Sequence, residues 1–301
     1  MSNNPNISYH NCTLCPRRCG VNRDLGELGY CNMPDRPIIA RAALHEWEEP
    51  IISGTNGSGT VFFSGCSLGC VYCQNREISR GGAGQEVSLG RLVDIMLGLA
   101  DRGAHNINFV TPTHYAPTVV DAVKAARGRG LNIPIVYNTS SYDELTTLRA
   151  LRDAVDIYLP DFKYYRSESA RRLSFAEDYC SVALAAIGEM VKQRPRPIIN
   201  GGIMTSGVVV RILLLPGHLA EAKLALKQIY STFGESVYIS LMSQYTPMPG
   251  MTPPLDRRVT RAEYGELVDY ASRLGIMQAF TQSIESASGT FIPSFDGTGV
   301  L

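Results

Sequence analysis

The amino-acid sequence predicts an α/β fold: a partial, open (β/α)6 barrel of the TIM type, with a small Cys-rich metal-binding segment at its N-terminus. From residue 60 onward, short apolar segments typical of strands alternate with segments of helical periodicity, and six such units follow one another. This alternation indicates a parallel sheet with right-handed crossovers. Because a full barrel needs eight units, six units favour a partial one. Four of the eight cysteines lie within residues 12–31, ahead of the first unit.

The N-terminal segment carries Cys12, Cys15, Cys19 and Cys31 among glycines and prolines. A segment this short is too small for a core of its own, and a metal bound by four thiolates would fold it. Zinc and an iron–sulfur cluster both accept four thiolates, so both remain candidates for a structural second metal. We divide the chain into this Cys-rich segment, residues 1–50, and a larger domain with a C-terminal tail, residues 51–301.

The strands of the predicted barrel are expected at residues 60–64, 106–110, 133–137, 155–159, 207–214 and 236–242. Helices are expected at residues 89–100, 117–127, 142–151, 180–191 and 219–233, with a further helix at 261–274 before a polar tail that starts at residue 278. In barrels of this kind, functional residues collect at the C-terminal ends of the strands. The polar residues that follow each strand are therefore candidates for a functional site.

Three cysteines follow the first strand directly, in the spacing C-x3-C-x2-C: Cys66, Cys70 and Cys73. Gly65 and Gly69 would let the backbone bend sharply, so that one loop aims three thiolates to the same side. Three thiolates fit three irons of a cubane cluster and leave the fourth iron open. A structural zinc site would need a fourth ligand, and no His or further Cys lies within about a dozen residues downstream.

The composition argues against several classes of protein. Lys plus Arg and Asp plus Glu both number 28, without a basic block, which disfavours nucleic acid as the main partner. The first residues lack the features of a signal peptide, and no apolar run reaches the length of a membrane span. We therefore expect a cytoplasmic protein without a membrane partner, in which clustered cysteines indicate metal more often than disulfides.

The cysteine loop, with the aromatic Tyr72 before its last cysteine, resembles that of radical S-adenosylmethionine (SAM) enzymes. More closely, the chain is similar to relatives of pyruvate formate-lyase activating enzyme that bear an N-terminal Cys-rich head, over residues 12–73 in cysteine pattern and about 60–245 in strand motifs. This resemblance implies a [4Fe-4S] cluster on Cys66, Cys70 and Cys73 that binds SAM at its open iron, with Tyr72 on the cofactor side. It also implies reductive cleavage of SAM to a 5′-deoxyadenosyl radical that abstracts hydrogen, with an electron donor of the flavodoxin or ferredoxin type.

The same resemblance, carried over by position, implies further cofactor-binding residues. Asn138 and Thr139 follow the third strand and Asp161 follows the fourth, where the activases contact SAM and a monovalent cation. An Asn where the family often has Asp removes one negative charge from that cation site. Lys163 could pair with Asp161, or it could order a substrate or the SAM carboxylate. After the second strand the family's G-G-E-like segment is absent, and Thr111 is the candidate in its place.

Arg211 interrupts the apolar fifth strand and matches the R-x-x-x-x-P-G motif of the activases. Burying an unpaired guanidinium is costly, so we expect an anion beside it inside the barrel. The SAM carboxylate and a structural Asp or Glu are both candidates for that anion.

Three functions are open at this point. The first is activation of a glycyl-radical partner protein, and the second is radical SAM modification of a small molecule or of another protein residue. The third is an Fe–S or zinc scaffold without turnover. Activases often carry a ferredoxin-like insertion after the first strand, and here only about 15 residues separate Cys73 from the next helix, so that insertion is missing.

Overall fold

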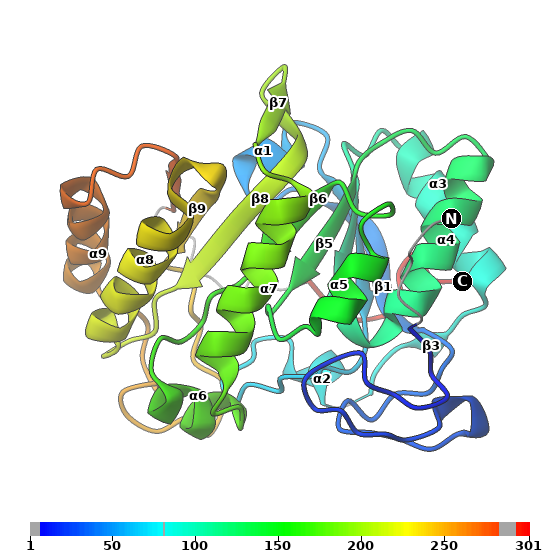
Figure 1. Ribbon diagram of the computed structural model, residues 1–301, viewed down its shortest axis with the longest axis horizontal. Coiled ribbons are helices and arrows are strands. Elements are labelled where there is room, and N and C mark those ends of the chain that lie inside the picture. The colour runs from blue at the N-terminus through cyan, green and yellow to red at the C-terminus, as the bar shows by residue number, and fades with distance from the viewer. Residues whose placement is uncertain (1–6, 81, 283–292) are drawn as a thin grey trace.

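The computed structural model describes residues 7–80, 82–282 and 293–301. Within them the chain forms one mainly parallel β-sheet, with helices packed along its outer face (Figure 1). The strands are β1 (Ile38–His45), β2 (Ser58–Phe63), β3 (Gln85–Glu86), β4 (Ile107–Val110), β5 (Ile135–Thr139), β6 (Ile157–Pro160), β7 (Ile198–Asn200), β8 (Ile203–Leu213), β9 (Tyr238–Met242) and β10 (Ala279–Thr281). Their order in the sheet is β10-β9-β8-β6-β5-β4-β2-β1-β3, and β7 pairs with β8.

The predicted α/β class and the six predicted strands are confirmed. They correspond to β2, β4, β5, β6, β8 and β9, which are parallel neighbours in this sequence order. The α-helices are α1 (Pro50–Ser53), α2 (Arg76–Ser79), α3 (Leu89–Asp101), α4 (Ala116–Gly128), α5 (Leu145–Ala150), α6 (Ser167–Ser174), α7 (Tyr179–Gln193), α8 (Leu219–Phe233) and α9 (Arg261–Arg273). The six predicted helices correspond to α3, α4, α5, α7, α8 and α9.

Besides the short elements α1, α2, β3 and β7, the strands β1 and β10 and the helix α6 were not expected from the sequence. The apolar stretch before residue 45 forms β1, which lies antiparallel to β2 at one side of the parallel strands. The strand β10 lies in the predicted polar tail and is held by parallel pairing with β9 and by stacking of Phe280 on Tyr238. The helix α6 buries only Ala170, Leu173 and Ser174, so its sequence lacks an apolar stripe. Short or polar elements of this kind depend on their tertiary contacts.

The periodicity of the helices explains how they cover the sheet. In α3 the buried positions include Leu92, Ile95, Met96 and Leu99, which form one apolar face. The helix begins where the Ser88 hydroxyl accepts a hydrogen bond from the backbone N–H of Arg91. Within the described residues, no helix combines the length and apolarity needed to cross a membrane.

We call residues 7–35 the head. Figure 1 shows the head, in dark blue, near the end of the sheet where the arrows of the parallel strands finish. Its centre is the fully buried Arg23, which donates to the backbone carbonyls of Met33, Pro34 and His114 and stacks on the Tyr9 ring. One arginine thus ties the head to the loop after β4.

Candidate active site

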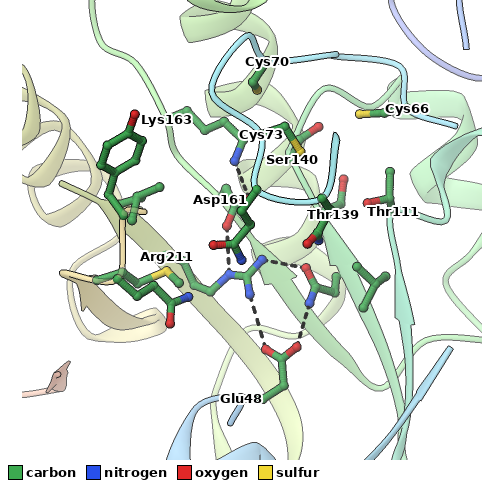
Figure 2. A pocket seen from close by; sticks show the side chains of 18 of the residues that line it. Glu48, Cys66, Cys70, Cys73, Thr111, Thr139, Ser140, Asp161, Lys163 and Arg211 are labelled. Atoms are coloured by element: carbon green, nitrogen blue, oxygen red, sulfur yellow. Dashed lines mark hydrogen bonds and ion pairs between the residues drawn. The ribbon is translucent and has the colours of Figure 1, made fainter. Parts of the chain in front are cut away.

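A pocket lies at the C-terminal ends of the parallel strands, as the fold class predicts (Figure 2). All the residues predicted for the cluster and for SAM line it: Cys66, Cys70, Tyr72, Cys73, Thr111, Asn138, Thr139, Asp161, Lys163 and Arg211. They come from the loop after β2 and from the ends of β4, β5, β6 and β8. The structure therefore brings the predicted residues of this domain together at one place.

The cysteine loop bends at the two glycines that the sequence singled out. Gly65 and Gly69 have φ angles of +83° and +69°, a left-handed conformation that side chains other than glycine rarely adopt. The backbone N–H groups of Leu68 and Gly69 each lie 3.4 Å from the Cys66 sulfur. Burial raises the pKa of the Cys66 thiol, and it raises the pKa of Cys73 to about 11.

Below the cysteine loop, Arg211 is the centre of a charged network (Figure 2). Its Nε donates to Asp161 at 2.8 Å, its Nη1 to Glu48 at 3.3 Å and its Nη2 to the Asn138 side-chain oxygen at 2.6 Å. The side chains of Arg211 and Glu48 are only 12% and 10% exposed. The sequence left two anions open for this guanidinium, the SAM carboxylate and a structural Asp or Glu. In the structure, carboxylates of the protein itself are in contact with it.

Lys163 extends the network toward the cysteine loop. Its ammonium group donates to the second carboxylate oxygen of Asp161 at 2.7 Å. Burial opposes ionisation of Asp161, but the charges of Arg211 and Lys163 outweigh it and hold the pKa of the carboxyl below its usual value. Asp161 therefore stays ionised between two cations and keeps both in place.

The end of β5 is held by a buried carboxylate beneath it. Asp143 accepts hydrogen bonds from Thr139 at 2.6 Å, from Thr113 at 2.7 Å and from the Tyr137 hydroxyl at 3.0 Å. Thr111 has a left-handed φ of +58°, and its N–H donates to the Asn138 carbonyl at 2.9 Å. These bonds fix the two neighbouring strand ends that face the pocket.

The acidic side of this pocket was not predicted from the sequence. Glu48 and Glu49 follow β1, and Glu48 contacts both Arg211 and the side-chain amide of Asn138. Glu49 is buried and accepts a hydrogen bond from Ser240 at 2.8 Å. The expectation that functional residues follow the parallel strands does not cover this pair, because it follows the antiparallel strand β1. The available signal in the sequence was an acidic pair directly after an apolar stretch, in a chain whose arginine within an apolar strand needs an anion.

The environment of Glu49 predicts a pH-dependent stability. Burial raises its pKa to about 7, beyond what the neighbouring Arg211 offsets, and Glu48 adds to the shift. Between the usual pKa of about 4.3 and 7, the unfolded state ionises this group while the native state keeps its proton, so stability falls as pH rises. Over about 2.7 pH units, at about 1.4 kcal/mol per unit, the loss amounts to about 4 kcal/mol.

Glu49→Gln, which still accepts from Ser240, should remove this loss. The measurement is urea unfolding of wild type and variant from pH 4.5 to 8, with the exposed Glu235→Gln as control. A difference between wild type and Glu49→Gln that does not change with pH would contradict the assignment.

The four cysteines of the head are free thiols that lie near one another. Cys12 and Cys15 are buried, Cys31 is partly buried and Cys19 is exposed. Burial raises the pKa of Cys15 to about 12, and the charges of the other three thiols add to the shift. In the part of the chain that the structure describes, no group of three or more His, Cys, Asp or Glu side chains is arranged to hold a metal ion.

Comparison with known proteins agrees with the cysteine loop. Residues 60–222 match the family described as the Radical SAM superfamily. The chain belongs to this superfamily. The chain is also similar to an uncharacterised protein of Methanocaldococcus jannaschii, with 27% identity over 279 residues that cover 89% of this chain and 76% of the relative. Membership supports SAM cleavage with a [4Fe-4S] cluster.

Solved structures share the fold of this radical SAM chain. Methylornithine synthase has a TM-score of 0.54 at 16% identity, over 80% of this chain and 71% of that protein. HydG, a maturase of the [FeFe]-hydrogenase, has a TM-score of 0.53 at 13% identity, over 80% of this chain and 54% of that protein. SuiB of Streptococcus suis bound to SAM has a TM-score of 0.50 at 12% identity, over 75% of this chain and 50% of that protein. At such identities the likeness concerns the fold alone.

The donor set of the pocket fits an iron–sulfur cluster. Three thiols from one loop line the same pocket, and each would serve a different iron, so they need not converge on one ion. The N–H groups at Cys66 are placed to stabilise a sulfur that carries negative charge. Among the described lining residues there is no fourth cysteine, which is consistent with an iron left open for a ligand.

Proposed function

We propose that Cys66, Cys70 and Cys73 hold a [4Fe-4S] cluster, and that the polar residues at the strand ends bind SAM beside it. A cluster held there would supply one electron that cleaves SAM to methionine and a 5′-deoxyadenosyl radical, and this radical would take hydrogen from a substrate. The observation that carries the proposal is the single pocket shared by the cysteine loop and the ends of β4, β5, β6 and β8. We also propose that this sheet is a partial, open barrel. The proposed division of the chain is into a Cys-rich segment, residues 1–50, and a larger domain with a C-terminal tail, residues 51–301.

The residues at the strand ends have distinct parts in this proposal. Tyr72, Thr111, Asn138 and Thr139 are the polar groups beside SAM. A guanidinium has five N–H donors, and the contacts of Arg211 with its three protein partners use three of them. Donors are therefore left for a ligand carboxylate while Asp161, which is itself paired with Lys163, keeps the arginine in position.

Activation of a glycyl-radical partner protein is a second candidate for the overall function. The resemblance of the strand-end motifs to those of the activases favours it, whereas the missing ferredoxin-like insertion after the first strand argues against it. Modification of a small molecule or of another protein residue competes with it, and the structurally similar methylornithine synthase is named for a small molecule. For either, we propose a flavodoxin- or ferredoxin-type electron donor, and zinc or an Fe–S cluster as a second metal on Cys12, Cys15, Cys19 and Cys31.

The proposal is tested with anaerobically reconstituted, dithionite-reduced protein. We expect 5′-deoxyadenosine to form from SAM, and the EPR spectrum of the reduced protein to change when SAM is added. A full complement of iron and sulfide without either result would favour the scaffold function. Addition of a glycyl-radical enzyme then separates activation from the alternatives, because activation predicts an organic radical on that added protein.

A further inference from the structure

The head contacts the cysteine loop through Arg17 and through Tyr30, whose hydroxyl donates to the Leu68 carbonyl at 3.3 Å. The guanidinium of Arg17 donates from Nε to the Ser67 carbonyl at 2.9 Å and from Nη2 to the Leu68 carbonyl at 3.3 Å. It also donates to the carbonyls of Ser174 at 3.0 Å and Phe175 at 2.6 Å, where α6 ends. One side chain therefore joins three segments that are far apart in the sequence: the head, the loop between two cluster cysteines, and the last turn of α6.

The geometry of α6 makes its end a suitable partner for a cation. Phe175 follows the helix in a left-handed conformation, with φ at +53°, and the last carbonyls of a helix have no partners within the helix. These carbonyls form the negative end of the helix dipole, so an arginine is favoured there. The Tyr30 ring, 3.9 Å from the Arg17 guanidinium carbon, packs against the cation.

The same turn of α6 holds the cysteine loop at Cys70. The fully buried Ser174 hydroxyl donates to the Cys70 sulfur at 3.0 Å, and the Leu173 carbonyl accepts from the Val71 N–H at 2.9 Å. The Tyr164 hydroxyl lies 2.7 Å from the Ser174 oxygen. Tyr164 donates its own proton to the Tyr72 hydroxyl at 2.8 Å, and the single Ser174 proton is directed to the Cys70 sulfur.

We propose that the head controls the environment of the cluster ligand Cys70 through Arg17, which keeps the Ser174 hydroxyl on the Cys70 sulfur. This inference rests on the proposed cluster at Cys66, Cys70 and Cys73. Hydrogen bonds to the sulfurs of an iron–sulfur cluster set its reduction potential, and a donor on a ligand sulfur favours the reduced, more negative state. Every hydrogen bond that the structure shows for Arg17 goes to a backbone carbonyl, so none of these partners neutralises its positive charge. A positive charge near the cluster also favours the reduced, more negative state.

Redox titration monitored by EPR, without SAM, tests the proposal. Ser174→Ala and Arg17→Ala should both shift the reduction potential to more negative values. Arg17→Ala should also lose iron to a chelator about tenfold faster, the lower end of the effect of groups that support metal ligands. Arg18→Ala, which removes an exposed ion pair with Glu144, and Ser181→Ala on the surface of α7 are matched controls expected to behave as wild type.

Arg17→Lys separates charge from geometry, because a lysine keeps the charge and cannot reach four carbonyls at once. Behaviour like Arg17→Ala would support the positioning role, whereas full restoration of the potential would overturn it in favour of charge alone. Wild-type potentials and iron-loss rates in Arg17→Ala and Ser174→Ala would overturn the proposal as a whole. Should Arg17→Ala not fold, Ser174→Ala and Arg17→Lys decide. Failure of the proposed function would be seen separately, as a wild-type EPR spectrum that SAM does not change.

Discussion

Cys70→Ala is expected to abolish 5′-deoxyadenosine formation and to reduce the retained iron. Cys70 lies between the other two cysteines of the loop, lines the pocket and receives the Ser174 hydroxyl on its sulfur. With one of three thiolates removed, a cubane cluster keeps two protein ligands and loses the fixed orientation of its open iron. Changes in residues that only support metal ligands cost 10–100-fold, so we expect a loss of at least about 100-fold for a ligand itself.

The matched control for this experiment is Cys180→Ala. Cys180 is a partly buried thiol on α7 and does not line the pocket. Iron content and SAM cleavage of Cys180→Ala should equal those of wild type, which separates loss of a ligand from general loss of a thiol. Normal cleavage by Cys70→Ala would mean that the reacting cluster is bound elsewhere.

Arg211→Met is expected to destabilise the protein by about 3–5 kcal/mol, the usual cost of removing one partner from a buried ion pair. Methionine retains the unbranched apolar part of the side chain and removes the guanidinium, so the main effect comes from the carboxylates left without their cation. Without the guanidinium, Glu48 loses its cation and Asp161 keeps only Lys163. The measurement is urea unfolding of the cluster-free protein, followed by circular dichroism.

An exposed ion pair provides the comparison for Arg211→Met. Arg129 contacts Asp94 at 2.7 Å, but both side chains are half exposed, at 55% and 50%. Arg129→Met should therefore cost less than about 1 kcal/mol. Equal effects of the two substitutions would show that the Arg211 network contributes no more than a surface pair.

The sequence predicted the cysteine loop well because its geometry is local. The spacing of the three cysteines and the bends at Gly65 and Gly69 involve only neighbouring residues, and the φ angles agree with the expectation. The parallel strands were also predictable, since each is a short, mainly apolar run, and helical segments alternate with these runs. Because these strands are parallel neighbours in the sheet, the ends of β4, β5, β6 and β8 lie at one edge and line one pocket.

Other contacts could not be predicted, because they join residues that are distant in the sequence. Arg211 and Glu48 are 163 positions apart, and Arg17 and Phe175 are 158 apart. The short strand β10 and the polar helix α6 carry too few apolar residues to show a period.

The sequence by itself determined that the chain has a parallel α/β sheet, a loop with three thiols for a cluster, and an arginine in an apolar strand that needs an anion. Only the tertiary structure decided which anions those are and where the head lies. The physical reason is that a buried charge requires some partner whatever the fold, whereas the identity of that partner depends on which side chains the packing brings within hydrogen-bonding distance.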